Sequence, residues 1–322
     1  MKAGSILSAY KRKIMNRKLA AILGPNYCGS TYAGYVLGSH DDVGFVSESV
    51  RFNRENHVRG DDCINCEKRG KSCHIWTPDL IGTDPAVWFK TIADRFSERL
   101  GTNLLVSTDK YAKAYDGKTE GCDVFPVVFF REPISFVSTY KIYHMLATAE
   151  KRADQLTYMD KKCSSVGGIL EYLEAHYDAI LKYVDRFDDV QFVDHDYLTA
   201  YKDTFRMICD FLGIEFDPAC LEFWKYEHHT IGGNDGAHSQ SNANEHVGRL
   251  MFPDIMESKN WGLWNTQERE IHVDFRWKSV MTANEILQIV DSRFYREIYV
   301  PMQVKFMDQL KNWISENEIQ KF

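Results

Sequence analysis

The sequence lacks several features that would place it in a familiar class. No apolar run approaches the roughly 18–20 residues that a helix needs to cross a bilayer. Positive charge is not in excess, because the formal net charge is −7 at pH 7, so no global field draws the chain to nucleic acid or to an anionic membrane. We find no internal repeat and no low-complexity tract. These absences argue against a membrane-spanning, nucleic-acid-binding or repeat protein, and local groups must bind any anionic ligand.

The N-terminal segment and the cysteines indicate a cytoplasmic protein. Residues 1–18 mix apolar and basic side chains, lack the apolar core of a secretory signal and predict a short amphipathic helix. The eight cysteines are scattered apart from one cluster, which suits reduced thiols better than a disulfide framework. With 322 residues, 44% of them hydrophobic, the chain can bury a sizeable core. We expect one domain over residues 1–322.

Short apolar runs alternate along the chain with segments of helical spacing. Strands are expected at residues 18–23, 43–48, 103–107, 124–130 and 190–194, and helices at 30–40, 85–100, 133–149, 167–187, 198–212 and 284–322. This alternation predicts right-handed crossovers and an α/β fold, with a mainly parallel sheet of about five strands flanked by helices. Ligands of such folds bind at the carboxyl ends of the strands, the edge where Glu48, Lys110 and Arg131 are expected.

Two segments interrupt this alternation. Residues 51–83 follow neither period and hold the cysteine cluster, so we interpret them as an insertion. Residues 228–265 are rich in glycine, asparagine and histidine and predict a long functional loop that covers the nucleotide or the substrate. The insertion, residues 235–265 of the long loop and residues 140–144 are expected to line the binding site of an acceptor molecule.

The first chemical motif is L-G-P-N-Y-C-G-S-T-Y-A-G at residues 23–34, between a predicted strand and a predicted helix. Its backbone N–H groups can cradle an anion at a helix N-terminus, and Ser30 and Thr31 add hydroxyl donors. Ser30 occupies the position where a nucleoside-triphosphate P-loop carries its lysine, which disfavours ATP and GTP. Taken alone, the pattern is equally typical of a plain glycine turn between a strand and a helix.

The second motif is V-V-F-F-R-E-P-I-S-F-V-S-T-Y at residues 127–140. Arg131 ends a buried strand just ahead of a helix that begins with proline, so its guanidinium is expected to point at the ligand edge. Ser138 and Thr139 lie about two helical turns further on, and one of them can return to the side facing Arg131. An arginine with a hydroxyl can clamp a phosphate, whereas a surface ion pair with Glu132 is the alternative.

Together the two motifs resemble the sulfotransferases that use 3′-phosphoadenosine 5′-phosphosulfate, in which G-x4-G-S-T precedes a helix and R-x-P-x4-S-T follows a later strand. Three further stretches resemble a bacterial-type branch of that family. L-G-S-H-D-D-V-G-F-V-S-E (37–48) resembles its second strand with a terminal glutamate, L-V-S-T-D-K (105–110) its D-S-S-K segment, and H-H-T-I-G-G-N (228–234) its late H-x-I-G-G-N loop. The resemblance spans about residues 18–240 and implies a three-layer fold like that of the P-loop NTPases.

The resemblance also implies which residues bind the donor. The first motif would hold the 5′-phosphosulfate, and the second would hold the 3′-phosphate. The residues carried over as nucleotide-binding are Tyr27, Cys28, Gly29, Ser30, Thr31, Arg131, Ser138, Thr139, Gly232, Gly233 and Asn234. Two positions depart from the family pattern. Tyr27 stands where many members carry a lysine or arginine, and the family's serine lies eight residues after its arginine, where this chain has Thr139 rather than Ser138.

Transfer of a sulfuryl group to a hydroxyl is an in-line displacement, which needs a base, donors to the sulfuryl oxygens and help for the departing phosphate oxygen. Glu48 is the expected base, with Asp109 and His144 as alternatives. Glu48 could instead be an exposed acid that caps the next segment. Lys110 matches the branch's lysine and is expected to replace the cation that Tyr27 cannot supply. The acceptor would be a small molecule, a glycan or a peptide hydroxyl.

The cysteine cluster, D-C-I-N-C-E-K-R-G-K-S-C-H-I-W at residues 62–76, has the spacing of a structural zinc site. Cys63 and Cys66 form a C-x2-C knuckle, and Cys73 with either His74 or a more distant ligand could complete a tetrahedron. The bacterial-type branch has a similar insertion, which does not by itself imply a metal. Reduced or redox-labile thiols in a flap on the substrate side are the alternative.

Three functional interpretations stay open at this point. A sulfotransferase that uses 3′-phosphoadenosine 5′-phosphosulfate agrees with all the motifs. A P-loop kinase of a small molecule would need ATP and magnesium, which the missing loop lysine and the lack of a clear Walker-B aspartate disfavour. The third interpretation is a nucleotide-binding or zinc-stabilised interaction protein without catalysis. Tyr27 favours it, because an uncharged side chain stands where the family carries a lysine or arginine.

Overall fold

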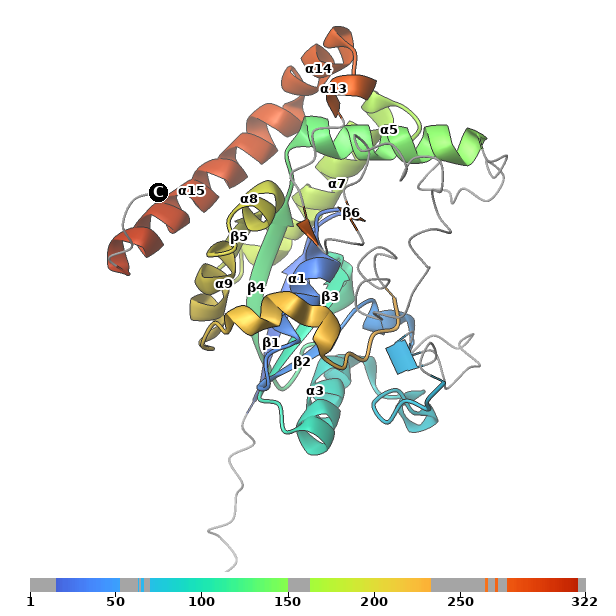
Figure 1. Cartoon of the computed structure of the whole chain (residues 1–322), viewed down its shortest axis with the longest axis vertical. Helices are drawn as coiled ribbons and strands as arrows, with labels where there is room; N and C mark the ends of the chain where they lie inside the picture. Colours follow the sequence, from blue (N-terminus) through green and yellow to red (C-terminus); the bar gives the residue numbers. More distant parts are fainter. Residues whose placement is uncertain are drawn as a thin grey trace, which may run out of the picture.

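The computed structural model describes residues 16–52, 63, 65–66, 70–149, 163–232, 264–265, 270–271 and 277–317. Its centre is a sheet of five strands in the order β2-β3-β1-β4-β5, and every neighbouring pair is parallel. The strands are β1 (Arg17–Leu23), β2 (Val43–Val46), β3 (Leu104–Lys110), β4 (Cys122–Phe130) and β5 (Gln191–Asp194). The predicted α/β fold with a mainly parallel sheet of about five strands is confirmed (Figure 1).

The remaining elements lie on both faces of the sheet and in the segments that connect its strands. The helices are α1 (Ser30–Leu37), α3 (Trp88–Leu100), α4 (Ala112–Tyr115), α5 (Pro133–Ala149), α7 (Val166–Val184), α8 (His195–Ala200), α9 (Thr204–Leu212), α13 (Trp277–Val280), α14 (Ala283–Val290) and α15 (Val300–Glu316). Short 3-10 turns are η1 (Ser49–Arg51), η2 (Pro78–Leu80), η3 (Pro85–Val87) and η5 (Pro218–Lys225), η6 (Phe294–Tyr299) is a π-helix, and β6 (Trp264–Asn265) pairs antiparallel with β7 (Glu270–Ile271). None of the helices in the described ranges has the length and apolarity needed to cross a membrane.

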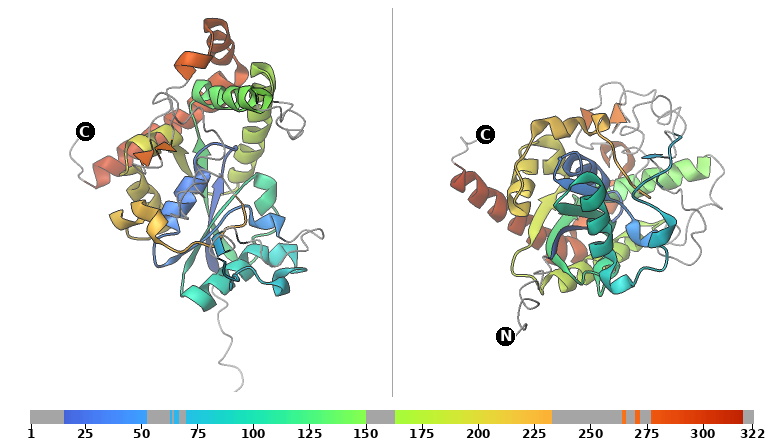
Figure 2. Two further views of the ribbon diagram at one scale, coloured as in Figure 1. Left: turned by 45° about the vertical axis from the view of Figure 1, so that its right-hand side comes forward. Right: turned by 90° about the horizontal axis from the view of Figure 1, so that it is seen from below.

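Alternate residues of the central strand β1 point to opposite faces of the sheet. Leu19, Ala21 and Leu23 pack in an apolar core with α3, α7 and α15, whereas Ala20 and Ile22 pack in a second core with α1 and α9. Figures 1 and 2 show the sheet between these two groups of helices. Because both faces are covered, the strands read as continuous apolar runs, as is usual in parallel sheets.

One predicted helix is wrong in its extent. The sequence predicts a single helix over residues 198–212, but the structure has α8 and α9 with a break between them. Asp194 starts α8 early because its carboxylate accepts hydrogen bonds from the amides of Asp196 and Tyr197 at 2.7 and 3.2 Å. Tyr201 then adopts an extended backbone and ends that helix. The chain therefore turns twice after β5, and the first turn brings His195 to the carboxyl edge of the sheet.

The boundaries of other elements also differ from the prediction. Strand β3 continues to Lys110 instead of ending at residue 107, and β2 ends at Val46. In the segment predicted as a helix over residues 85–100, the first turn is a 3-10 turn, and α3 follows it. Residues 1–15 of the predicted N-terminal helix lie outside the described residues, and Arg17 already belongs to β1.

Strand β5 forms one edge of the sheet and is covered there by α15 (Figure 1). Gln309 of α15 takes the place of a neighbouring strand, because its side chain satisfies two backbone groups. Its Oε1 accepts from the amide of Phe192 at 2.9 Å, and its Nε2 donates to the carbonyl of Val190 at 2.6 Å. This contact protects an edge that would otherwise be open to pairing with another chain.

We expect Gln309→Ala to lower the free energy of unfolding by about 1–3 kcal/mol, because it leaves two backbone groups at the strand edge without a partner. Urea unfolding followed by circular dichroism measures this effect. Lys311→Ala on the exposed side of the same helix is the control and should change the stability little. Equal stability of Gln309→Ala and the control would show that the side chain does not hold this edge.

Candidate functional site

Three residues of the carboxyl edge of the sheet have a left-handed backbone. Tyr27, Glu48 and Lys110 have φ values of 64°, 55° and 67°, and no other residue except glycine has a positive φ in the described part of the chain. They follow or end three adjacent strands, β1, β2 and β3. Such conformations cost free energy and cluster at functional sites. All three residues belong to the sequence motifs, so the strained backbone and the motifs fall at the same positions.

Residues 24–29, here called the glycine loop, connect β1 to α1 and need their glycines for space. A Cβ placed on Gly24 would lie 2.7 Å from the carbonyl oxygen of Phe129, and one on Gly29 would lie 2.3 Å from Cδ2 of His195. Gly29 also has a φ of 81° at the start of α1. The loop therefore runs close to two neighbouring segments and directs the first amides of α1 toward the edge of the sheet, where an anion can bind.

The side chains of the loop differ in what they can offer to a ligand. Ser30 and Thr31 are buried at the start of α1. Cys28 is fully buried in the core beside α1, and this burial raises the pKa of its thiol. A protonated thiol in the core is a packing group, so Cys28 can contribute only backbone groups to a ligand. Tyr27 packs its ring edge-on against Tyr140, with the ring centres 5.3 Å apart.

Glu48 and Lys110 face each other across adjacent strands. The Lys110 Nζ lies 3.3 Å from Glu48 Oε1, and the two side chains are 7% and 14% exposed for Lys110 and Glu48, respectively. Gly232 of the late loop lies against Glu48, because a Cβ on this glycine would fall 2.5 Å from Glu48 Oε2. Three stretches far apart in the sequence thus meet at one carboxylate. Gly233 and Asn234 lie outside the described residues.

Asp109, the alternative base, has its carboxylate occupied by other groups. Its Oδ2 accepts from the hydroxyls of Ser49 and Ser107 at 2.6 and 2.7 Å, and its Oδ1 accepts from the amide of Val50 at 3.0 Å. Burial raises the pKa of this carboxyl, and the hydrogen bonds act against that shift. Asp109 therefore positions the turn that follows Glu48, and its oxygens face these donors instead of an acceptor.

Arg131 joins the glycine loop to α5. Arg131 is 5% exposed. Its Nη1 donates to the Thr139 hydroxyl at 3.1 Å and to the Tyr27 carbonyl at 3.4 Å. Its Nη2 donates to the Ser135 hydroxyl at 2.8 Å. Its Nε lies 3.9 Å from the carboxylate of Asp196. The guanidinium is therefore held in place before any ligand binds, and Glu132 instead caps α5.

The two candidate hydroxyls after Arg131 differ in their contacts. Thr139 contacts the guanidinium, whereas the Ser138 hydroxyl is fully buried and donates to the carbonyl of Ser135 at 2.7 Å. Ser135 is a site residue that the sequence reasoning missed. Its spacing of four residues from Arg131, at the start of a predicted helix, is the signal that could have revealed it.

His195 is a second residue that the sequence reasoning missed. It follows β5 directly and lies on Gly29, and its Nδ1 lies 3.0 Å from Asp196 Oδ1. Asp196 in turn faces Arg131. The position directly after a buried strand, at the carboxyl edge of a parallel sheet, could have indicated it. His144, the other alternative base, lies on α5 beyond the residues that contact Arg131.

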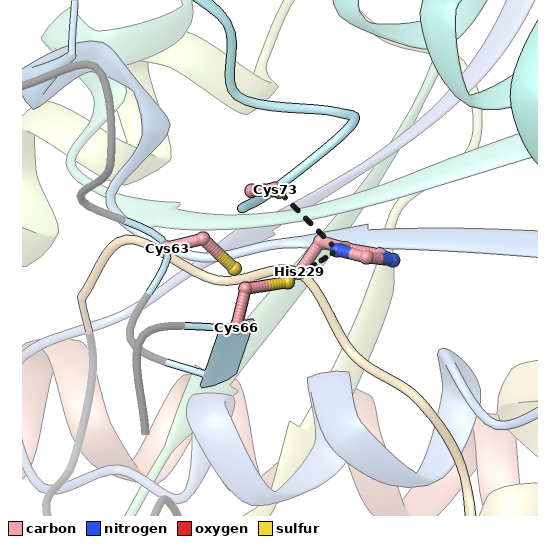
Figure 3. A group of neighbouring side chains, drawn as sticks. All are labelled: Cys63, Cys66, Cys73 and His229. Carbon is pink, nitrogen blue, oxygen red and sulfur yellow. Dashed lines mark hydrogen bonds between the residues drawn. The ribbon is translucent and has the colours of Figure 1, made fainter. Parts of the chain in front are cut away.

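The cysteine cluster gathers around a histidine from another part of the chain (Figure 3). Cys63, Cys66, Cys73 and His229 place their ligand atoms within 4.8 Å of one another, and all four residues are buried. The Cys66 and Cys73 sulfurs lie 3.5 and 3.4 Å from His229 Nδ1. His74 is exposed and only packs its ring edge-on against His229. The fourth member is thus the distant histidine, because the late loop crosses the insertion here.

The electrostatics of this group favour thiolates at two of the three cysteines, Cys66 and Cys73. Hydrogen bonds from the Cys63 thiol lower the pKa of Cys66 and Cys73, and the same bonds raise the pKa of Cys63. Burial alone would lower the pKa of His229, but its hydrogen bond to Cys73 and the charges of Cys73 and Cys66 outweigh burial and raise it. All eight cysteines of the chain are free thiols.

No protein-family model matches the sequence, and no curated protein matches it. Solved structures that resemble the chain over most of its length include three sulfotransferases. A sulfotransferase domain from the curacin biosynthetic pathway has 13% identity and a TM-score of 0.43, over 85% of this chain and 96% of that one. A sulfotransferase domain from the Synechococcus PCC 7002 olefin synthase has 16% identity and a TM-score of 0.40 (86% and 94%). The sulfotransferase STF9 from Mycobacterium avium has 9% identity and a TM-score of 0.41 (76% and 77%). Because each TM-score lies below 0.5, the function has to be argued from the site itself.

One buried group next to the site makes the fold sensitive to acid. His176 of α7 packs edge-on against Tyr111, with ring centres 4.9 Å apart, and its buried Nε2 has no hydrogen-bond partner among the described residues. Burial lowers the pKa of His176 to about 4, and the charges of Lys113 and Lys110 act in the same direction. The neutral imidazole is therefore part of the folded state, directly behind the glycine loop.

We expect His176 to make the chain less stable as the pH falls from about 6.5, the pKa of an unfolded histidine, toward 4. The unfolded state takes up the proton first, so the loss reaches about 2 kcal/mol at pH 5. In His176→Phe this part of the pH dependence should vanish, as measured by urea unfolding at several pH values. His74→Gln, an exposed control, should keep it. A His176→Phe variant with the parent's pH dependence would contradict the assignment.

Proposed function

We propose that this chain is a sulfotransferase, which moves a sulfuryl group from 3′-phosphoadenosine 5′-phosphosulfate to a hydroxyl of its acceptor. The observation that carries the proposal is the meeting of Tyr27, Glu48 and Lys110, all with a left-handed backbone, at one edge of the sheet. The Arg131 guanidinium is tied to the same edge, because it donates a hydrogen bond to the Tyr27 carbonyl. One edge of the sheet then holds the glycine loop, the cations Lys110 and Arg131, and the carboxylate of Glu48. Sulfuryl transfer needs such groups to bind the donor and to accept the acceptor's proton.

The donor would bind along the two motifs. The amides at the start of α1, with Ser30 and Thr31, would receive the 5′-phosphosulfate. Arg131, with Thr139 and Ser135, would hold the 3′-phosphate, since a guanidinium already fixed by hydroxyls keeps its fork in one orientation. The backbone of the late loop would cover the nucleotide at Gly232, Gly233 and Asn234.

Lys110 would replace the cation that the loop lacks. Tyr27 offers a ring packed on Tyr140 and no charge, whereas the Lys110 carbonyl accepts from the amide of Gly24 at 3.1 Å and ties this lysine to the glycine loop. In the structure its ammonium group pairs with Glu48. When the donor is bound, the ammonium can turn to the bridging oxygen of the phosphosulfate, and Glu48 then faces the acceptor.

In the reaction, Glu48 would take the proton of the acceptor hydroxyl while the hydroxyl oxygen attacks the sulfur. The bond between sulfur and the bridging phosphate oxygen breaks in line with the attack. The electron pair leaves on the 5′-phosphate, whose charge Lys110 would stabilise. The products are the sulfate ester of the acceptor and 3′-phosphoadenosine 5′-phosphate. The negative charge on the transferred group is spread over its remaining oxygens, which the amides at the start of α1 would face.

A kinase that uses ATP fits these residues less well. Ser30 stands in the place of the P-loop lysine, and Asp109, at the end of the strand beside β1, is occupied by Ser49, Ser107 and the Val50 amide. This aspartate therefore cannot take the place of a magnesium-binding carboxylate without giving up those bonds. Calorimetric titration with 3′-phosphoadenosine 5′-phosphate and with ATP tests the choice. Tight binding of the first and weak binding of ATP is the expected result.

We expect Arg131→Ala to weaken binding of 3′-phosphoadenosine 5′-phosphate by roughly 1.5–3 kcal/mol, since it removes a charge-assisted clamp. Thr139→Val should weaken it by about 0.5–1.5 kcal/mol. Ser138→Ala is the matched control and should bind like the parent, because its hydroxyl already serves the helix backbone. Calorimetry on variants with the parent's circular dichroism spectrum gives the answer. Weaker nucleotide binding by Ser138→Ala, with parent-like binding by Thr139→Val, would show that the clamp uses the Ser138 hydroxyl and not that of Thr139.

Glu48→Gln should reduce turnover by about 10²–10⁴-fold with donor affinity near the parent's, since the amide keeps the size of the side chain but accepts no proton. Lys110→Met should reduce both turnover and donor affinity, because its charge contacts the donor before and during transfer. The measurement is steady-state sulfate transfer with a panel of hydroxyl acceptors, paired with calorimetry. Glu98→Gln, an exposed acid on α3, is the control. Parent-like turnover in Glu48→Gln would remove Glu48 as the base.

A further inference from the structure

The group of Cys63, Cys66, Cys73 and His229 has no role in the proposed transfer reaction. Its members come from two segments that are distant in the sequence, since 156 residues separate Cys73 from His229. Figure 3 shows the three sulfurs and the imidazole turned toward one another between the insertion and the late loop. Three cysteines and a histidine that converge in this way form the ligand set of a structural zinc site.

We propose that these four residues bind one zinc ion, and that this ion fastens the late loop to the insertion beside Glu48. The first part stands without the proposed reaction, because it concerns the metal alone. The second part concerns the position of the late loop beside Glu48. His229 is the new member, since the spacing of the cysteines alone leaves the fourth ligand open.

The distances between the ligand atoms fit a tetrahedral ion. With zinc–sulfur bonds of about 2.3 Å and zinc–nitrogen bonds of about 2.0 Å, a sulfur and a nitrogen ligand lie about 3.5 Å apart. The Cys66 and Cys73 sulfurs lie 3.5 and 3.4 Å from His229 Nδ1. All four residues are buried, as in closed structural sites. Soft sulfur donors select zinc over magnesium or calcium, which prefer oxygen.

The surroundings of the group suit thiolates bound to a metal. The backbone amide of Trp76 donates to the Cys73 sulfur at 3.4 Å, a contact that stabilises a coordinated thiolate. With Nδ1 as the ligand, the proton of His229 stays on Nε2, which is buried and has no hydrogen-bond partner among the described residues.

The late loop is held to the insertion at this histidine and at the residue that follows it. The Trp76 indole donates to the His229 carbonyl at 3.0 Å, and the Thr230 hydroxyl donates to the Asn65 side chain at 2.5 Å. Two residues after Thr230, Gly232 lies against Glu48. A metal at His229 therefore fixes the end of a short segment whose other end contacts the proposed base.

Elemental analysis of the untagged full chain tests the metal site. We expect about one zinc per chain in the parent and almost none in Cys73→Ser and His229→Ala. Cys122→Ser and His74→Gln are the controls and should keep the metal, because neither residue belongs to the group. His229→Cys preserves four ligands and should retain zinc even if His229→Ala fails to fold. A parent chain without metal, with iron in its place, or with a disulfide within the group overturns the zinc assignment.

Cobalt(II) and hydrogen exchange provide readouts that do not depend on activity. Cobalt added to the chelated parent should give the visible absorption of a tetrahedral thiolate complex, and His229→Ala should not give it. Chelation should also speed amide exchange in the segment from His228 to Gly232 by about tenfold or more, while exchange in β4 stays slow. Unchanged exchange in that segment would overturn the role of the metal as a fastener, whatever the metal content.

Discussion

The buried carboxylate of Asp109 holds the ends of β2 and β3 in the shape on which the site depends. Removing a carboxylate from water costs several kcal/mol unless hydrogen bonds replace the lost solvation. Here the hydroxyls of Ser49 and Ser107 and the amide of Val50 replace it. The residue before Ser49 and the residue after Asp109 are the proposed base and the proposed cation. Both have left-handed backbones, so the bonds to this one carboxylate compensate for strain at its two neighbours. The two side chains therefore stand opposed before a ligand arrives, which is how a preorganised site avoids reorganisation during the reaction.

A parallel sheet brings the other parts of the site to the same edge. Each strand must be followed by a crossover, so its carboxyl end always opens into a connecting segment on one side of the molecule. The glycine loop, Glu48, Arg131 and His195 belong to such segments and Lys110 ends β3, so all five strands contribute to this edge. Because apolar side chains cover both faces of the sheet, ligand contacts are left to these ends. Strain at the edge, about 1–2 kcal/mol for each left-handed residue, is then compensated by the core below it.

Local signals explain which predictions succeeded. The helix over residues 133–149 begins at the predicted residue because proline starts it and the preceding strand is a long apolar run. The segment over residues 198–212 is different, since Asp194 caps a helix whose start depends on where β5 ends. The choice of Thr139 for the contact with Arg131 needs the rotation of α5 relative to the strand, which spacing alone does not give. His229 could not be paired with the cysteines from sequence, because only the folded sheet brings the late loop across the insertion.

The insertion over residues 51–83 explains why a metal would be useful beside this site. Ile75, Trp76 and Leu80 of the insertion pack in the main core, but its described residues hold little regular structure, and a segment so small has few internal contacts that fix its shape. A zinc ion shared with His229 would supply that order and, through the same histidine, would fix the loop that reaches Gly232. The Glu48 side chain would then be confined from two directions. Asp109 sets the turn that carries it, from the side of the sheet, and a metal-bound loop would confine it from the other side. A base with two such constraints keeps one orientation toward an acceptor even though the residues around it come from loops.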